Sequence, residues 1–355
     1  MGTMKYSLLD HFSVIEPCVS PSLLDKVSVD SVKEFCALFP FDIADDFGFE
    51  SRLGKREAFC DFVLQIKKGS KGAAILAGQS SIASIADQLK ADPFWKKIAQ
   101  LFAIWNNPEH FLSKMVTDFW LEFDWQGTSY NLTPNIFFDL KSGNQANRAK
   151  QWQSIHQVLD IIYNTLFNIS FPREMAATVQ SCILNLPGKA QLHWIGFMVP
   201  RKTEAVRLNI SGLNPETCFN YLHEINWPGE EDVIRNQVNL FSEKFDFIMY
   251  NINIGREVLP YLGFELFLKE MRRPTCSPKH IEVIDFLSAQ SLLLEEKKEG
   301  LIRFCGRKTV SYFYPVLYLN GINHFKYVYK KNSPPELKAY FGTMIRNKMD
   351  YGTER

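Results

Sequence analysis

The sequence has almost no excess charge of either sign and no long apolar run. Its 40 basic and 39 acidic residues give a formal charge of +1, which provides no broad field for binding nucleic acid or an anionic membrane surface. No segment approaches the roughly 18 unbroken apolar residues of a membrane-spanning helix. We therefore expect a protein without a membrane span, in which any anion site is local.

Paired cysteines and a secretion signal are also lacking. The seven cysteines are scattered along the chain, and none forms the C-x-x-C pair that would indicate a redox or zinc motif. Residues 1–17 lack the apolar run and the small-residue cleavage site of a secretory signal. A cytoplasmic protein with ordinary packed thiols is the default expectation.

Common motifs for phosphate, dinucleotide and metal sites are missing as well. Residues 48–55 superficially resemble a phosphate loop, but Arg56 stands where serine or threonine is needed. There is no G-x-G-x-x-G, H-E-x-x-H or G-x-S-x-G. Asp42, Asp45 and Asp46 could hold Mg²⁺ beside a diphosphate, although such a run is more often a solvated acidic turn. The sequence therefore assigns no metal site and leaves open Mg²⁺ that accompanies a diphosphate.

Alternating apolar and polar residues predict a series of half-buried strands. In residues 60–67, for example, Cys60, Phe62, Leu64 and Ile66 alternate with polar or smaller neighbours. Tight turns join such strands into five predicted antiparallel hairpins. The pairs are 60–67 with 73–78, 118–125 with 135–140, 193–199 with 205–210, 245–254 with 262–269, and 323–330 with 336–342.

Segments with helical spacing separate the hairpins. The expected helical regions are 30–38, 80–115, 145–167, 173–185, 214–225, 231–241 and 278–296. Residues 39–55, which contain Pro40 and two glycines, are predicted to be a loop, and 300–319 has no clear pattern. A hairpin followed by one or two helices thus recurs with a period of roughly 65 residues.

This repeat predicts an α+β fold in which helices cover the apolar face of an antiparallel sheet. If the sheet closes, the result is a barrel of about ten strands, built from ββα(α) units, with a ring of helices outside and polar residues inside. An open sheet with one wet face would give the same alternation. Closure is favoured because helices after every hairpin would crowd one face of a flat sheet. The predicted organisation is an N-terminal helical and loop segment over 1–55, a barrel over 56–345 and a tail over 346–355.

The polar strand faces carry the candidate site residues. Five are cations, which would repel one another inside a barrel unless acids or an anionic ligand balanced them. Such a set suits a diphosphate, whereas a single strand lysine is usually solvated. Acids on the same faces include Glu122, Asp124 and Glu265, and nearby aromatic rings could face a cation or simply pack in the core. The five cations are Lys67, Arg207, Lys269, Lys326 and Lys338, and the aromatic residues are Trp120, Tyr250, Phe267 and Tyr340.

The repeated order of helices and strand pairs, with Lys338-Ala-Tyr340 on a late strand, resembles the ABBA-type aromatic prenyltransferases. The resemblance implies a transferase of secondary metabolism that moves an allylic group from a prenyl diphosphate to an aromatic small molecule or peptide. It implies that strand cations bind the diphosphate, tyrosines shield the carbocation and an acid contacts the acceptor.

Carried over by position, the resemblance gives the candidates definite roles. Lys67, Arg207, Lys269, Lys326 and Lys338 would bind diphosphate. Tyr340 would shield the cation, in a pocket with Tyr250, Trp120, Asn209 and Phe267. Glu122 or Glu265 would act on the acceptor, with Glu122 preferred because it lies beside Trp120 and Asp124 on a polar face. Asn209 and Val328 stand where the family pattern expects shielding tyrosines.

Two other functions fit the same residues. A non-catalytic barrel or sheet could use mixed charges and aromatic rings to bind a peptide or a lipid-like ligand. An enzyme of another class could use Glu122 and Asp124, which share one strand face, as acid and base.

Overall fold

Ten antiparallel strands close into a barrel in the computed structural model, which describes residues 6–141, 147–201, 204–269, 276–312 and 315–347. The order around the ring is β10, β9, β8, β7, β6, β3, β2, β1, β13 and β12, and pairing of β10 with β12 closes it. The predicted closed barrel is therefore confirmed. Because β12 is long, its first half also pairs with β11, an eleventh strand outside the ring.

The barrel strands are β1 (Asp46–Arg52), β2 (Cys60–Lys67), β3 (Val116–Phe123), β6 (Asn135–Leu140), β7 (Gln191–Phe197), β8 (Val206–Ser211), β9 (Phe247–Ile254), β10 (Val258–Phe267), β12 (Pro315–Lys330) and β13 (Glu336–Asn347). Outside the ring are β11 (Gly306–Ser311) and the short hairpin β4 (Trp125–Gln126) and β5 (Ser129–Tyr130).

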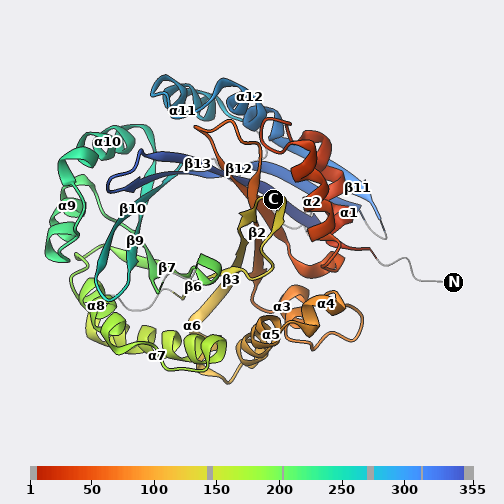
Figure 1. The fold of residues 1–355 in the computed structure, drawn as a ribbon, viewed down its shortest axis with the longest axis horizontal. Helices are drawn as coiled ribbons and strands as arrows, with labels where there is room; N and C mark the ends of the chain where they lie inside the picture. The colour runs from red at the N-terminus through yellow and green to blue at the C-terminus, as the bar shows by residue number, and fades with distance from the viewer. Residues whose placement is uncertain (1–5, 142–146, 202–203, 270–275, 313–314, 348–355) are drawn as a thin grey trace, which may run out of the picture.

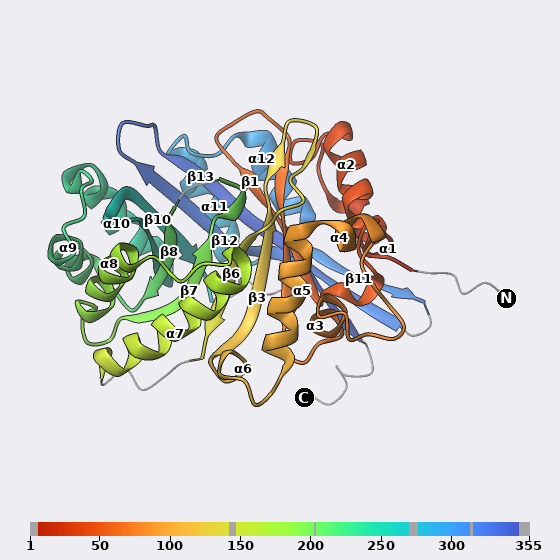
Figure 2. The ribbon, with the colours of Figure 1, turned by 60° about the horizontal axis from the view of Figure 1, so that its bottom comes forward.

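The helices surround the ring of strands (Figure 1). They are α1 (Leu8–Ile15), α2 (Lys26–Cys36), α3 (Lys71–Leu76), α4 (Asp87–Ala91), α5 (Pro93–Asn106), α6 (Phe111–Met115), α7 (Arg148–Phe167), α8 (Arg173–Leu184), α9 (Pro215–Glu224), α10 (Glu231–Lys244), α11 (Pro278–Ala289) and α12 (Glu295–Phe304). Figure 2 shows β11 on the side of the barrel where α1 and α2 lie. No helix in the described part of the chain is long and apolar enough to cross a membrane.

Four of the five predicted hairpins are present with the expected partners. They are β3 with β6, β7 with β8, β9 with β10, and β12 with β13. The long amphipathic helix predicted over 145–167 is α7, and Asn214 caps α9 by accepting a hydrogen bond from the Thr217 backbone N–H, as its sequence predicts. The region 80–115 contains three separate helices, and the helix predicted over 278–296 ends at Ala289.

The first hairpin differs from the prediction, because β2 pairs with β1 on its N-terminal side. β1 lies within 39–55, which the glycines and Pro40 had suggested to be a loop. Phe47 and Phe49 nevertheless alternate with Gly48 and Glu50, and the two phenylalanines are buried. The N-terminal segment predicted over 1–55 therefore supplies a barrel strand.

Residues 73–78, predicted to be the partner of β2, instead belong largely to helix α3. The Ser70 side chain accepts a hydrogen bond from the Ala73 backbone N–H and caps this helix. The run of small residues after a serine cap favours a helix by propensity. At the other end of the chain, β13 continues to Asn347, so most of the tail predicted over 346–355 lies outside the described residues.

The apolar core lies between the barrel and the helices. On β3, Phe119, Leu121 and Phe123 are fully buried under the helical layer. The residues between them face the lumen, and the buried polar and charged residues of the protein include many on these inner faces. The predicted inversion, with apolar residues outside and polar residues inside, is thus confirmed.

Two glycines allow β1 and β13 to approach closely. Gly48 and Gly342 are register partners, and Gly342 also pairs with Gly321 on β12. A Cβ atom on Gly342 would lie 2.4 Å from the Phe47 carbonyl oxygen and 2.7 Å from the Gly48 Cα. Both contacts are with backbone, which cannot move aside as a flexible side chain can.

We expect Gly342→Ala to lower the free energy of unfolding by about 1–3 kcal/mol or more, because the added methyl group forces two strands apart. Gly306→Ala is the matched control, since its Cβ would meet nothing within 4 Å. Chemical denaturation of both variants measures the difference. Equal stability of the two variants would contradict the close approach of the strands.

Candidate functional site within the barrel

The barrel encloses two adjoining cavities. The central cavity has a volume of about 100 Å³, and the outer chamber has a volume of about 340 Å³. Val63, Trp120, Asn323 and Tyr340 line both. The lumen therefore has two parts of unequal volume, and these four residues form the wall between them.

The central cavity combines aromatic walls with a polar lining. Trp120, Phe137 and Trp194 come from the neighbouring strands β3, β6 and β7. The polar part of the lining consists of Glu122, Arg207, Asn209, Asn251, Glu265, His324 and Lys326. The predicted Glu122, Glu265, Arg207, Lys326, Asn209, Trp120 and Tyr340 are thus brought together in one cavity.

Arg207 is a buried cation with neutral neighbours. Its Nε donates to the Asn253 side-chain oxygen at 2.9 Å, and its guanidinium carbon lies 4.8 Å from the centroid of the Tyr261 ring. In the part of the chain that the structure describes, no carboxylate forms an ion pair with it. A buried guanidinium without a counter-charge favours binding of an anion.

Lys326 is neutralised within the cavity. Its Nζ lies 3.2 Å from Glu265 Oε1, and Asn209 donates to the other Glu265 oxygen at 2.8 Å. Burial by itself would raise the pKa of Glu265, but Lys326 and the hydrogen bonds hold it below its usual value. Glu265 is therefore a stable anion, which makes it a weak base.

Lys338 and Tyr340 share a partner that the sequence had not suggested, Glu50 of β1. Lys338 Nζ lies 2.6 Å from Glu50 Oε1, and the Tyr340 hydroxyl donates to Glu50 Oε2. Burial would raise the pKa of Glu50, but Lys338 and Arg52 keep it well below its usual value. The lysine and tyrosine of the Lys-x-Tyr motif are thus both held by one buried carboxylate.

Asp61 of β2 is the register partner of Glu50 and forms an ion pair with Arg52 at 2.9 Å. It also accepts the Trp125 backbone N–H at 2.8 Å. Burial and the charge of Glu50 raise the pKa of Asp61 to about 7, against the opposing effect of Arg52. The carboxyl of Asp61 therefore takes up a proton more readily than that of Glu50.

Glu122 is held by Arg201, which precedes β8 in the chain. Arg201 Nη2 lies 3.0 Å from Glu122 Oε1 and 2.6 Å from Asp124 Oδ1. Asn135 also donates to Asp124 at 2.9 Å. Burial and the nearby Glu50 raise the pKa of Glu122, while Arg201 opposes this rise. Of the two predicted acids, Glu122 is the better proton acceptor.

Five predicted residues do not line the central cavity, and Lys338, bound to Glu50, lines neither cavity. Lys67 lines the outer chamber, and Lys269 is exposed beyond the end of β10 and lines neither cavity. Tyr250 packs in the outer core against Phe264, with ring centroids 5.7 Å apart, because its place on β9 puts it on the face opposite Asn251. Phe267 lies near one end of the lumen, beside His324.

A row of neighbouring aromatic rings crosses four strands at this end of the barrel. Phe247 and Phe267 are parallel with centroids 4.6 Å apart, and Phe267 lies 4.7 Å from His324. His324 in turn stacks on Tyr340 at 4.3 Å. One face of the Tyr340 ring is therefore occupied by His324, so Trp120, Phe137 and Trp194 are better placed to shield a cation in the central cavity.

Asn251 is a further lumen residue that the sequence analysis missed. It is fully buried, lines the central cavity, and its amide oxygen and nitrogen have no hydrogen-bond partner among the described residues. The signal that could have found it is its alternation with Tyr250 on a predicted strand. A bound polar group would satisfy this amide.

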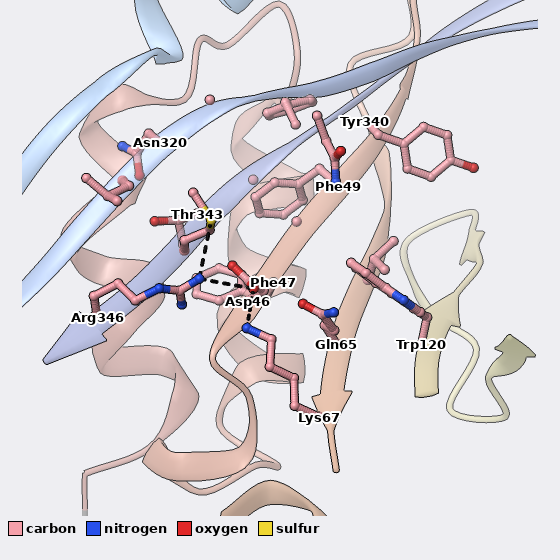
Figure 3. A pocket seen from close by; sticks show the side chains of 18 of the residues that line it. Asp46, Phe47, Phe49, Gln65, Lys67, Trp120, Asn320, Tyr340, Thr343 and Arg346 are labelled. Atoms are coloured by element: carbon pink, nitrogen blue, oxygen red, sulfur yellow. Dashed lines mark hydrogen bonds and ion pairs between the residues drawn. The ribbon is translucent and has the colours of Figure 1, made fainter. Parts of the chain in front are cut away.

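The outer chamber is lined mainly by apolar residues, together with Gln65, Asn320, Asn323 and Thr343, and has a charged end. Figure 3 shows Lys67 and Arg346 converging on Asp46, with Trp120 and Tyr340 to their right. Lys67 Nζ lies 3.0 Å from Asp46 Oδ2, and Arg346 Nη2 lies 3.8 Å from the same atom. Asp42, which the sequence grouped with Asp46, instead pairs with Lys71. No three His, Cys, Asp or Glu residues of the described chain are grouped to hold a metal ion.

We expect Lys338→Met to lower the free energy of unfolding by about 3–5 kcal/mol, because it leaves the Glu50 carboxylate buried without its lysine. Chemical denaturation measures the loss. The double variant Glu50→Gln with Lys338→Met should recover part of it, and Lys90→Gln on the outer helix α4 serves as the control. A single variant as stable as the control would contradict the role of this ion pair.

Comparison with known proteins found likeness only among solved structures. AnaPT from Neosartorya fischeri is 11% identical with a TM-score of 0.48, over 89% of this chain and 85% of that one. The 5-dimethylallyltryptophan synthase from Streptomyces coelicolor is 11% identical with a TM-score of 0.44, over 98% of this chain and 97% of that one. No family model matches the sequence, and no curated protein sequence matches it. The αββα-barrel architecture expected from the sequence is established by the strand pairing itself.

Proposed function

We propose that the protein is a prenyltransferase that moves an allylic group from a prenyl diphosphate to an aromatic acceptor within the barrel lumen. The observation that carries the proposal is Arg207, a buried cation without a carboxylate partner in the described chain, which lines the same cavity as three aromatic rings. The barrel fold adds support by analogy only.

The lining supplies a group for each part of the reaction. Breakage of the bond between the allylic carbon and the diphosphate oxygen leaves an anion, which Arg207 would stabilise together with Lys326. Trp120, Phe137 and Trp194 would face the allylic cation and exclude water. The acceptor ring would form the new carbon–carbon bond and release a proton, for which Glu122 is the acceptor.

The proposed diphosphate site differs from the one expected from the motif. Lys326 and Lys338 already form ion pairs with Glu265 and Glu50, which partly neutralise the positive charge of both lysines. Arg207 and the unpartnered amide of Asn251 remain to meet an incoming anion. Lys338 then acts by fixing Glu50 and Tyr340 in place. Mg²⁺ bound to the diphosphate would add positive charge beyond what Arg207 and Lys326 provide.

Incubation with labelled dimethylallyl or geranyl diphosphate and aromatic acceptors, with and without EDTA, tests the activity. Inorganic pyrophosphate should raise the melting temperature of the wild-type protein and should not raise that of Arg207→Gln, because this variant lacks the positive charge of the guanidinium. Lys90→Gln should respond like the wild type. A pyrophosphate response that survives Arg207→Gln would remove Arg207 from the site.

The paired lysines favour a second candidate function. A lumen in which Lys326 and Lys338 are neutralised by acids also suits a barrel that binds a neutral or mixed-charge ligand without chemistry. Absence of both turnover and pyrophosphate stabilisation in the wild-type protein would favour this function over transfer.

The pH dependence of turnover should report on Glu122. Only the ionised carboxylate accepts a proton, so the rate should rise with pH through the raised pKa of Glu122. Arg201 opposes that rise in pKa, so Arg201→Gln should move the acid limb of the kcat/KM profile to higher pH. Arg201→Lys, which keeps the charge, should leave the limb near its wild-type position. An unchanged limb in Arg201→Gln would exclude the coupling.

A further inference from the structure

Two half-buried cysteines, Cys276 and Cys305, lie together outside the lumen. Cys276 directly precedes Ser277, the N-cap of α11, and Cys305 directly follows the last residue of α12. The two helices are in contact and lie on the same side of the barrel (Figure 1). Neither cysteine lines the two cavities of the described chain, so the pair is separate from the site of the proposed transfer reaction.

Hydrogen bonds bring the two sulfur atoms to the same turn of α12. Cys276 Sγ donates to the Ile302 carbonyl oxygen at 3.9 Å, and Cys305 Sγ donates to the Leu301 carbonyl oxygen at 3.5 Å. These acceptors are consecutive residues in the last turn of the helix. The two thiols also share a hydrogen bond with each other. The chain thus places two thiols in contact although they are far apart in the sequence.

The main chain is anchored beside each of the two cysteines. Next to Cys276, the Ser277 hydroxyl and His280 Nδ1 are hydrogen-bonded at 2.9 Å in the cap of α11. Next to Cys305, Phe304 is fully buried and packs against Phe341 of β13, with ring centroids 5.0 Å apart. These contacts keep the two sulfur atoms within reach of each other.

The shared hydrogen bond makes the two thiols chemically unequal. It lowers the pKa of Cys276, against the opposing effect of burial, and it raises the pKa of Cys305, to which burial also contributes. The thiolate is the form that attacks an oxidant, so Cys276 is the better nucleophile of the two. By contrast, burial raises the pKa of the four core cysteines, Cys36, Cys60, Cys182 and Cys218.

We propose that Cys276 and Cys305 form a redox-active pair, which a peroxide oxidises to a reversible disulfide. The Cys276 thiolate attacks one peroxide oxygen and breaks the oxygen–oxygen bond, giving a sulfenic acid and hydroxide, which takes up the proton that Cys276 had lost. The Cys305 sulfur then attacks the Cys276 sulfur and forms the disulfide, while the sulfenic hydroxyl leaves with the Cys305 proton as water. With hydrogen peroxide, two thiols are oxidised and two water molecules form. A thiol reductant reverses the reaction by exchange.

The pair also contacts the wall of the barrel. The Ile322 backbone N–H hydrogen-bonds to the Cys305 sulfur, next to the irregularity of β12 between Ile322 and His324. Asn323, which lies between these two residues, lines both cavities. A disulfide bond is much shorter than a contact between two thiols. Oxidation therefore draws the sulfur atoms together and changes the surroundings of the Ile322 amide.

Peptide mapping of the full chain tests the disulfide. The reduced protein is treated with hydrogen peroxide, the remaining thiols are blocked with N-ethylmaleimide in denaturant, and the unreduced digest is analysed by mass spectrometry. The expected product is a linked pair of peptides that contain Cys276 and Cys305, which dithiothreitol separates. Absence of this product, or equal oxidation of all seven cysteines, would overturn the proposal.

Three single variants separate the roles of the two thiols. Cys305→Ser should accumulate a sulfenic acid at Cys276, which dimedone traps, because no second thiol resolves it. Cys276→Ser should give no dimedone adduct at Cys305. Cys18→Ser is the matched control, since Cys18 is also half-buried, and it should form the disulfide like the wild type. An adduct at Cys305 in Cys276→Ser would overturn the assigned order of attack. Circular dichroism confirms that each variant folds, and the mapping of the wild-type chain needs no variant.

Hydrogen exchange measured by mass spectrometry tests the link to the barrel. Oxidation should change the exchange rate of the peptide that contains Ile322 by about fivefold, as expected when one hydrogen bond is altered. Peptides from α7 should be unaffected. Cys276→Ser, treated in the same way, should show no change in either region. An unchanged rate at Ile322 with the disulfide in place would overturn the link to β12.

Discussion

The antiparallel pairing of β10 with β12 is the constraint on which the rest of the structure depends. It joins the two ends of the sheet and turns one face of every strand toward an enclosed space. Water cannot freely solvate the charged side chains placed there, so most of them pair with an opposite charge within the barrel, and Arg207 is the exception that the described residues leave without a carboxylate. The apolar faces must then be covered from outside, which is what the ring of helices does.

The lumen meets this requirement by distributing its charges into small clusters. Glu50 holds Lys338 and Tyr340, Glu265 holds Lys326, and Arg201 holds Glu122 with Asp124. Each cluster joins residues from different strands or from a strand and a connecting segment. The same contacts that neutralise charge also fix the relative position of the strands. Burial and Glu50 raise the pKa of Glu122 in spite of Arg201, whereas Lys326 and Asn209 hold the pKa of Glu265 below its usual value.

Periodicity in the sequence predicts most of the fold because a strand between a helix layer and a polar lumen must alternate. It also places Glu122, Arg207, Glu265 and Lys326 on inward faces, where they are found. It could not find Glu50, because the glycines around it are needed for strand approach yet are typical of loops. It could not find Arg201 either, since this residue lies between strands, where alternation carries no information. The predicted partner of β2 was wrong for a related reason. A short turn after β2 favours pairing with residues 73–78, whereas the strand that pairs with β2 is β1, which precedes it in the chain.

The backbone contact between Gly48 and Gly342 also determines how the protein can change over evolution. The outer chamber owes part of its width to positions at which even a methyl group meets the neighbouring main chain. A single substitution at Gly48 or Gly342 therefore cannot change the width of the chamber without moving the neighbouring backbone. Variation in the size and shape of the chamber must come from the facing side chains, such as Leu319 and Met344. Related barrels that differ in ligand preference should thus differ at these positions while retaining both glycines.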